Sequence, residues 1–165
     1  GKLITTLING IPVSESIGSI PNLPRQPEIL HGLRNLVQNA VDFAHHNVWI
    51  DITWTEETIR ILVADDGKGY PNDFLGRIGD PFLRRQKTKK DPGRPEYEGM
   101  GLGLFIAKTL LERTGAQLIF ANGTSTTVPN AAFEFATGAV VSVIWIRKDI
   151  LANTELGPEN IPVQI

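Results

Sequence analysis

Two neighbouring segments have the pattern of a β-hairpin, and this feature constrains the fold more than any other. Residues 48–55, VWIDITWT, and residues 58–67, TIRILVADDG, both alternate β-branched or aromatic residues with polar ones. This two-residue period is typical of strands that bury one face. Only Glu56 and Glu57 separate the segments, so the chain turns back at once and the strands pair antiparallel. The sheet is therefore expected to be mixed or antiparallel.

The same periodicities predict the remaining strands and two helices. Strands are expected at 3–8, 116–122 and 139–146, and helices at 26–46 and 102–113. Pro27 suits the first turn of the first helix, and Gly115 suits the end of the second. The order β-α-β-β-loop-α-β-β predicts an α/β fold, a two-layer sandwich with helices on one face of a mixed sheet.

The domain organisation follows from length and from the irregular segments. A chain of 165 residues suits one domain with a substantial core. We assign residues 1–150 to this domain and residues 151–165 to a C-terminal tail. Residues 9–27 hold four prolines and are interpreted as a connector or arm. The stretch 80–99 is long for a loop in a compact domain, a length typical of a lid, a binding loop or disorder.

The charge balance and the lack of cysteine exclude several classes of function. Sixteen basic and eighteen acidic side chains leave a net charge of −2, so no global basic field draws the chain onto nucleic acid. Without cysteine there is no disulfide framework and no thiolate metal site, which fits a reducing compartment. No apolar run approaches the roughly 18 residues that cross a bilayer. We expect a soluble cytoplasmic domain, which can belong to an inner-membrane sensor.

The stretch 80–99 nevertheless concentrates positive charge. Six of the sixteen basic residues lie in it: Arg84, Arg85, Lys87, Lys89, Lys90 and Arg94. Two interpretations remain open, a solvated run of charges and a local binding site for an anion.

Three glycine clusters are candidates for a phosphate site: DDGKGY at 65–70, RIGDPF at 77–82 and GMGLGL at 99–104. A P-loop is excluded because Gly69 follows Lys68, where Ser or Thr is required. The dinucleotide and protein-kinase glycine loops both need a glycine where Leu104 stands. None of these familiar phosphate motifs is therefore present.

The third cluster still predicts a useful geometry. Gly99, Gly101 and Gly103 run directly into the apolar helix expected from residue 102. Successive N–H groups without a Cβ in the way would converge at the helix N-terminus, where the dipole favours an anion. The cluster predicts a seat for a polyphosphate, although glycines before a helix also suit a turn or close packing.

The first predicted helix carries an unusual polar stripe. At about 100° per residue, its apolar side is opposed by five polar residues: His31, Asn35, Asn39, Asp42 and His46. A solvated face is the ordinary explanation. Asparagine, however, is a mediocre helix former, so its repeat one turn apart has no local reason. Its amide oxygen is a neutral hard ligand of the kind that Mg²⁺ accepts.

Four motifs now stand in a fixed order: HGLRNLVQNA, DDGKG, GDPF and GMGLGL. Together they resemble the N, G1, F and G2 boxes in the catalytic, ATP-binding domain of bacterial sensor histidine kinases, members of the GHKL superfamily. The resemblance covers residues 31–114 and implies the Bergerat ATP-binding fold. The segments NLVQNAVDFA and GLGLFIAKTLLERTGA are most similar to the redox-responding RegB/PrrB kinases.

The resemblance implies roles for individual residues. Asn39 matches the asparagine that binds Mg²⁺, and Asn35 lies near it on the helix; both are expected to be catalytic. Asp65 matches the carboxylate that accepts a hydrogen bond from the adenine amine. The stretch 83–98 matches the ATP lid. Residues expected to contact ATP are Asn35, Asn39, Asp65, Gly67, Gly69, Gly99, Gly101, Gly103 and Leu104.

The chain departs from the family pattern in three places. Asp42 stands where many of these kinases carry Lys or Arg, and Phe82 is the one clear aromatic of the F box. No H box is present, so His31, His45 and His46 are interpreted as structural. The expected partners are therefore ATP and a separate domain of the same kinase that carries the phosphoacceptor histidine. The resemblance further implies a homodimeric parent protein and, indirectly, a response regulator.

Asn35 distinguishes a kinase from an ATPase. Hsp90, MutL and gyrase-type ATPases resemble the same pattern but carry glutamate at this position, as the base that activates water. An amide has no useful basicity near neutral pH, so Asn35 favours a kinase that keeps its phosphoryl group for histidine. Three alternatives remain open: a GHKL-type ATPase, a serine kinase like the anti-sigma factors, and a degenerate ATP-binding regulatory module.

Overall fold

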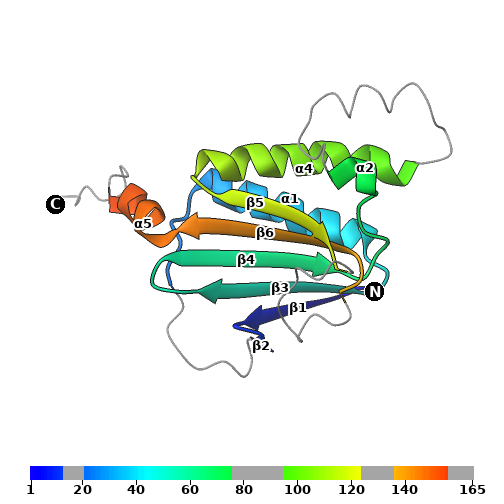
Figure 1. Cartoon of the computed structure of the whole chain (residues 1–165), viewed down its shortest axis with the longest axis horizontal. Coiled ribbons are helices and arrows are strands. Elements are labelled where there is room, and N and C mark those ends of the chain that lie inside the picture. Colours follow the sequence, from blue (N-terminus) through cyan, green and yellow to red (C-terminus); the bar gives the residue numbers. More distant parts are fainter. Residues whose placement is uncertain (13–20, 76–94, 124–135, 156–165) are drawn as a thin grey trace, which may run out of the picture.

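The computed structural model describes residues 1–12, 21–75, 95–123 and 136–155, which form a two-layer α/β sandwich (Figure 1). One mixed sheet has the strand order β2-β1-β3-β4-β6-β5. β1 and β3 pair in parallel and every other neighbouring pair is antiparallel. The strands are β1 (Leu3–Ile8), β2 (Ile11–Pro12), β3 (Asn47–Trp54), β4 (Thr58–Asp65), β5 (Gln117–Asn122) and β6 (Ala139–Ile146). The predicted fold class and the predicted hairpin are confirmed.

Two long helices, α1 (Pro27–Phe43) and α4 (Pro95–Arg113), lie on one face of the sheet and run in opposite directions (Figure 1). They approach closely at Gly32, where an added Cβ would lie 2.5 Å from Cγ of Leu111. Glycine at this position therefore lets the two backbones pack side by side. Two shorter helices complete the described part of the chain, α2 (Asn72–Leu75) and α5 (Arg147–Glu155).

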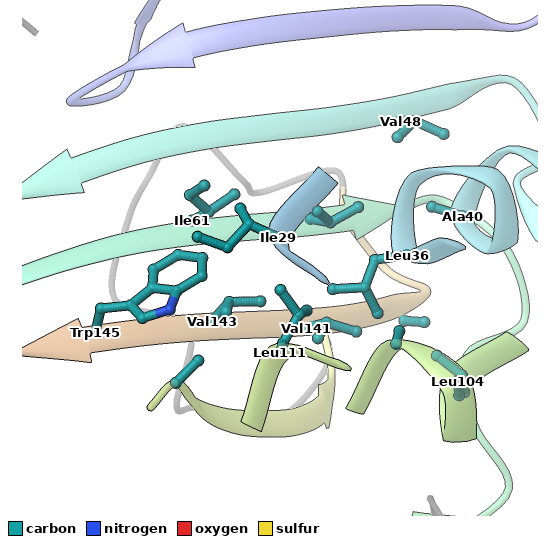
Figure 2. Close-up of a cluster of buried hydrophobic side chains, with 14 of the residues drawn as sticks. Ile29, Leu36, Ala40, Val48, Ile61, Leu104, Leu111, Val141, Val143 and Trp145 are labelled. Atoms are coloured by element: carbon teal, nitrogen blue, oxygen red, sulfur yellow. The ribbon is translucent and has the colours of Figure 1, made fainter. Parts of the chain in front are cut away.

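The main core fills the space between these helices and the sheet. Figure 2 shows Leu36 of α1 and Leu111 of α4 among side chains from the strands, with Trp145 at one end. Trp145 is almost fully buried, and its Nε1 donates a hydrogen bond to Oγ1 of Thr114 at 2.9 Å. Thr114 in turn donates to the carbonyl of Leu111 at 2.6 Å. The C-terminal end of α4 is thus tied to β6.

Several predicted boundaries differ from the structure. The first helix ends at Phe43 instead of residue 46, because Ala44 is extended, with φ −61° and ψ 147°. The second begins at Pro95, seven residues before the predicted start at 102. Pro and Glu at 95 and 96 suit a first helical turn, a signal that the apolar periodicity from 102 onward did not contain.

The irregular segments also contain more structure than predicted. β2 lies within the predicted connector 9–27, and the boundary placed at residue 150 falls inside α5. Ile150 is buried in the core, while Leu151 is exposed. Residues 76–94 lie outside the described part, which removes most of the predicted lid, its basic residues and Phe82 from structural comment.

Candidate functional site

The polar stripe predicted on α1 is not uniform. His31 and Asp42 are exposed and Asn35 is half-buried, but Asn39 is only 8% exposed. The reason is α4, which covers the arc of α1 that contains Gly32 and, two helical turns further on, Asn39. Asn39 therefore does not lie on a solvated face with the other polar residues but at the edge of the buried face, and its role as a ligand of Mg²⁺ stays a prediction.

The amide of Asn39 is the first unusual group of the site. It forms no hydrogen bond with any residue in the described ranges, and it is not among the fully buried side-chain groups without a partner, so part of the amide stays accessible. Because α1 and α4 are antiparallel, Asn39 lies toward the end of the helix pair where Figure 2 places Ala40 and Leu104. This end of α1 therefore presents an amide oxygen that can ligate a cation.

Asp65, at the end of β4, is the second unusual group. It is 1% exposed, and its Oδ1 accepts hydrogen bonds from the N–H of Gly67 at 2.8 Å and of Ala139 at 3.2 Å. Its Oδ2 accepts none from the described residues. Burial raises the pKa of this carboxyl above its ordinary value, and these two hydrogen bonds act in the opposite direction. One carboxylate oxygen is held by the protein and the other is left for a donor.

Glycines bring the backbone close around Asp65. A Cβ at Gly138 would lie 2.0 Å from Oδ1 of Asp65, and a Cβ at Gly67 would lie 2.2 Å from the carbonyl oxygen of Phe43. Phe43 is the last residue of α1 and follows Asn39 by one turn. The close approach at Gly67 therefore places the Asp65 turn against the same end of α1 that carries Asn39.

Asp66 holds the end of β4 against the chain that follows α1. The sequence analysis assigned no role to this residue. Its carboxylate accepts hydrogen bonds from the backbone N–H groups of His45, His46 and Asn47 at 2.9, 3.0 and 3.1 Å, and from the Asn47 side chain at 3.0 Å. Partial burial raises the pKa of Asp66, but these hydrogen bonds outweigh it and lower the pKa to about 2. Asp66 thus ties the chain after α1 to the end of β4.

A second clamp, also missed from the sequence, holds the other side of the turn. The Asn122 amide accepts a hydrogen bond from the N–H of Tyr70 at 2.7 Å and donates one to its carbonyl at 2.8 Å. Gly69 precedes Tyr70 with φ +75°, and its Cβ would lie 2.6 Å from Oδ1 of Asn122. Glycine at position 69 is thus needed for the turn itself. The only signal in the sequence was an asparagine at a strand end.

The glycines near the start of α4 are arranged differently from the prediction. Gly99, Gly101 and Gly103 lie inside the helix, which begins at Pro95, so the predicted seat of free N–H groups at a helix start is corrected. No described atom lies within 4 Å of a Cβ built on Gly101 or Gly103, so there is room at each of these two positions. The Leu104 side chain is 1% exposed in the core (Figure 2), and the expected contact of Leu104 with ATP stays a prediction.

The site therefore joins the second half of α1, the turn after β4 and the glycine-bearing part of α4. Among the described residues there is no group of three or more His, Cys, Asp or Glu that could hold a metal ion. A cation would thus depend on the Asn39 amide together with oxygen atoms of a ligand. No helix in the described ranges is long and apolar enough to cross a membrane.

Comparison with known proteins places these features in a family. Residues 25–148 match the family described as "Histidine kinase-, DNA gyrase B-, and HSP90-like ATPase". The chain is 52% identical over 147 residues to "Sensor histidine kinase RegB" of Cereibacter sphaeroides, covering 87% of this chain and 32% of that protein. It is 36% identical over 80 residues to "Sporulation kinase A" of Bacillus subtilis, covering 47% and 12%. The chain spans about a third of the length of RegB.

Two solved structures have the same fold. Full-length ShkA in complex with AMPPNP superposes with a TM-score of 0.59 and 22% identity, over 88% of this chain and 25% of that one. The catalytic domain of the histidine kinase ThkA gives a TM-score of 0.57 and 18% identity, over 88% of this chain and 81% of that one.

Proposed function

The chain belongs to the family of histidine kinase-, DNA gyrase B- and HSP90-like ATPases, as its motifs predicted, and we propose that it binds Mg·ATP and delivers the γ-phosphoryl group to a histidine. That histidine lies on a dimerisation domain of the same kinase, outside these residues. The parent protein is then a homodimer that phosphorylates a response regulator. The domain works in the cytoplasm, where ATP is available.

The proposal rests on the carboxylate of Asp65, which accepts hydrogen bonds at only one of its two oxygens. An acid that is 1% exposed and has one oxygen without a donor among the described residues is costly unless a ligand supplies one. The exocyclic amine of adenine is such a donor. Gly67 and Gly69 shape the turn beside it, so the base is expected to lie against this turn.

Asn39 is the proposed ligand for Mg²⁺. The residue is only 8% exposed, and its amide forms no hydrogen bond with the described residues. Mg²⁺ prefers oxygen ligands and keeps several positions for water and phosphate, so one neutral protein ligand suffices when a triphosphate is bound. The glycine segment of α4, with room at Gly101 and at Gly103, is the proposed place for the phosphates.

The chemistry then needs positioning more than covalent catalysis. A ring nitrogen of the acceptor histidine attacks the γ-phosphorus as the bond to the bridging oxygen breaks, and ADP leaves. A neutral imidazole needs no base to attack, so the amide at Asn35 is compatible with transfer. It leaves water without an activator, which keeps hydrolysis slow.

Calorimetry with Mg·ATP tests the site directly. We expect wild type to bind in the micromolar range or weaker, and both Asp65→Asn and Asn39→Ala to reduce the affinity strongly. Asp51→Asn is a matched control, because Asp51 is also buried, 3% exposed, and accepts the N–H of Gly10 at 3.0 Å on the other face of the sheet. Undiminished binding by Asp65→Asn would overturn the site assignment.

A transfer assay separates the kinase from its alternatives. The domain is mixed with a candidate acceptor domain and ATP labelled at the γ-phosphate, and labelled protein and free phosphate are both measured. Label on the acceptor supports the proposal. Rapid phosphate release without labelled protein would favour an ATPase, and binding without either product would favour a regulatory module.

A further inference from the structure

Lys2 lies immediately before β1 and reaches the C-terminal end of α1. Its Nζ donates hydrogen bonds to the carbonyl oxygens of Val41 at 2.5 Å and Asp42 at 3.3 Å. The last four carbonyl groups of a helix have no partner within the helix. In α1, the carbonyl of Ala40 accepts the N–H of Ala44 at 2.8 Å, and Lys2 supplies a donor for the two carbonyls that follow.

The charges at this end of α1 give the contact a clear physical role. The last turn of α1 contains no basic residue. Asp42 instead adds a negative charge where the helix dipole favours a positive one. The Asp42 carboxylate accepts a hydrogen bond from the neutral amide of Gln38 at 2.8 Å, which does not offset that charge. Lys2 thus brings a positive charge to the helix end from outside the helix.

The same end of α1 carries the proposed metal ligand. Asn39 precedes the two carbonyls that Lys2 contacts by two and three residues. The chain just after the helix is held by the N–H of Leu3, which donates to the carbonyl of His46 at 2.8 Å, and by the Asp66 carboxylate. Helix ends fray first, so loss of the Lys2 contacts would loosen the turn from which the Asn39 amide projects.

We propose that Lys2 is a positioning residue for Asn39, which it serves by holding the last turn of α1 so that the amide oxygen can ligate Mg²⁺. This inference rests on the proposed function. Lys2 acts through the helix and not on the nucleotide, so its removal should weaken only the part of ATP binding that depends on the metal. The contact also couples the start of β1 to the metal site.

The test compares Lys2→Met with wild type in binding ATP, once with Mg²⁺ and once with EDTA. Methionine keeps an unbranched side chain but removes the charge and the donors. NMR titration measures both affinities, because it also covers weak binding. We expect Lys2→Met to bind Mg·ATP about threefold more weakly, the effect of one charge at a helix end, and to bind metal-free ATP as wild type does.

Two further variants control for the charge itself. Lys2→Arg keeps the positive charge and the donors, so it should restore the affinity for Mg·ATP. Lys148→Met removes the same charge from an exposed position in α5 and should change neither affinity. Unchanged Mg·ATP affinity in Lys2→Met, or failure of Lys2→Arg to restore it, would overturn the inference.

Asn39→Ala separates positioning from simple capping of the helix. In the Asn39→Ala background, Lys2→Met should have no further effect on the affinity for Mg·ATP, because the group that it positions is gone. The melting temperature should fall by the same small amount in both backgrounds. A loss of affinity that is equal with and without Mg²⁺, or equal in both backgrounds, would also overturn the inference, since a purely structural cap acts in that way.

The outcomes distinguish this inference from the proposed function. Wild type whose ATP affinity responds neither to Mg²⁺ nor to Asn39→Ala overturns the proposed metal ligand, and the role of Lys2 with it. Binding that depends on Mg²⁺ and on Asn39 but is insensitive to Lys2→Met overturns the role of Lys2 alone.

Discussion

The two halves of the proposed nucleotide site are built in opposite ways. The base-side turn, residues 65–70, is held by Asp66 on one side and by Asn122 on the other. The glycine segment of α4, residues 99–103, has no described atom within 4 Å of a Cβ at Gly101. The first half is preorganised, so a ligand that binds there, such as the proposed base, would not have to order the turn. The second half leaves room for a ligand to complete it.

Asp65 and Asp66 repeat this contrast within two adjacent residues. Asp66 is partly exposed, its carboxylate is filled by the protein, and its pKa is lowered to about 2. Asp65 is buried, and one of its oxygens has no donor among the described residues. Identical side chains thus have different surroundings: Asp66 holds the scaffold, and Asp65 has an oxygen available for the proposed ligand.

The largest effect is expected from filling the tightest contact of the base-side turn. In Gly138→Ala the new Cβ would lie 2.0 Å from Oδ1 of Asp65 and 2.6 Å from the N of Gly67. Both atoms are fixed, so we expect a loss of about 3 kcal/mol in the free energy of unfolding and loss of ATP binding. Urea denaturation and calorimetry measure the two effects. Near-wild-type stability would show that the turn yields easily and is not preorganised.

Asp65→Asn should separate stability from binding. We expect ATP affinity to fall about 100-fold, since a hydrogen bond to a buried charge is lost. The folded-state pKa of Asp65 is raised, so the ionised carboxylate destabilises the native state as pH rises through that pKa. The variant without ATP should therefore melt no lower than wild type at neutral pH. A large drop in its melting temperature would contradict the view that Asp65 is kept for the ligand.

Asp66→Asn should cost about 1 kcal/mol at pH 7, because charge-assisted hydrogen bonds become weaker neutral ones at a partly exposed site. The folded-state pKa of Asp66 is depressed from 3.8 to about 2. Its stabilisation is therefore present above about pH 4 and is lost as pH falls toward 2. The difference between wild type and variant, measured by urea denaturation from pH 7 to pH 2, should vanish in that window. A constant difference would assign Asp66 a different role.

The smallest effect is expected in the glycine segment. Gly101→Ala meets no described neighbour, so it should raise the free energy of unfolding by about 0.5–1 kcal/mol through helix propensity. If the phosphates approach this side of α4, the same methyl group should weaken ATP binding several-fold. Gly103→Ala is the companion variant. Thermal melts and calorimetry would detect both changes, and unchanged ATP affinity would remove this segment from the site.

The fold was largely predictable because its signals are local. The alternation of apolar and polar residues over 48–55 and 58–67 is a pattern of neighbouring residues, so it can be recognised without knowing the fold. The structure has the expected strands, with their ends shifted by one or two residues. The parallel pairing of β1 with β3 was not specified, since it depends on a crossover through α1. The start of α4 was missed because the prediction followed apolar periodicity alone.

The parts of the site that were missed depend on distant contacts. The burial of Asn39 is caused by α4, which is more than fifty residues away in the sequence. The Asn122 amide contacts Tyr70 across 52 residues, and no local pattern marks such a pair. In the sequence, Asp66 is only the second acid of a DDG motif, and nothing there indicates which groups its carboxylate binds. Helical spacing could indicate that Asn39 was unusual, but only the packed helices show which way it faces.

The hydrogen bond from Trp145 to Thr114 gives α4 one anchored end, while its other end carries three glycines. Amide hydrogens should accordingly exchange with heavy water in a gradient along this helix, slowest around Leu111 and fastest near Gly99. Adding nucleotide should slow exchange from the glycine end inward and leave the anchored turn unchanged. The helix would then report, residue by residue, how far the influence of a bound nucleotide extends into the domain.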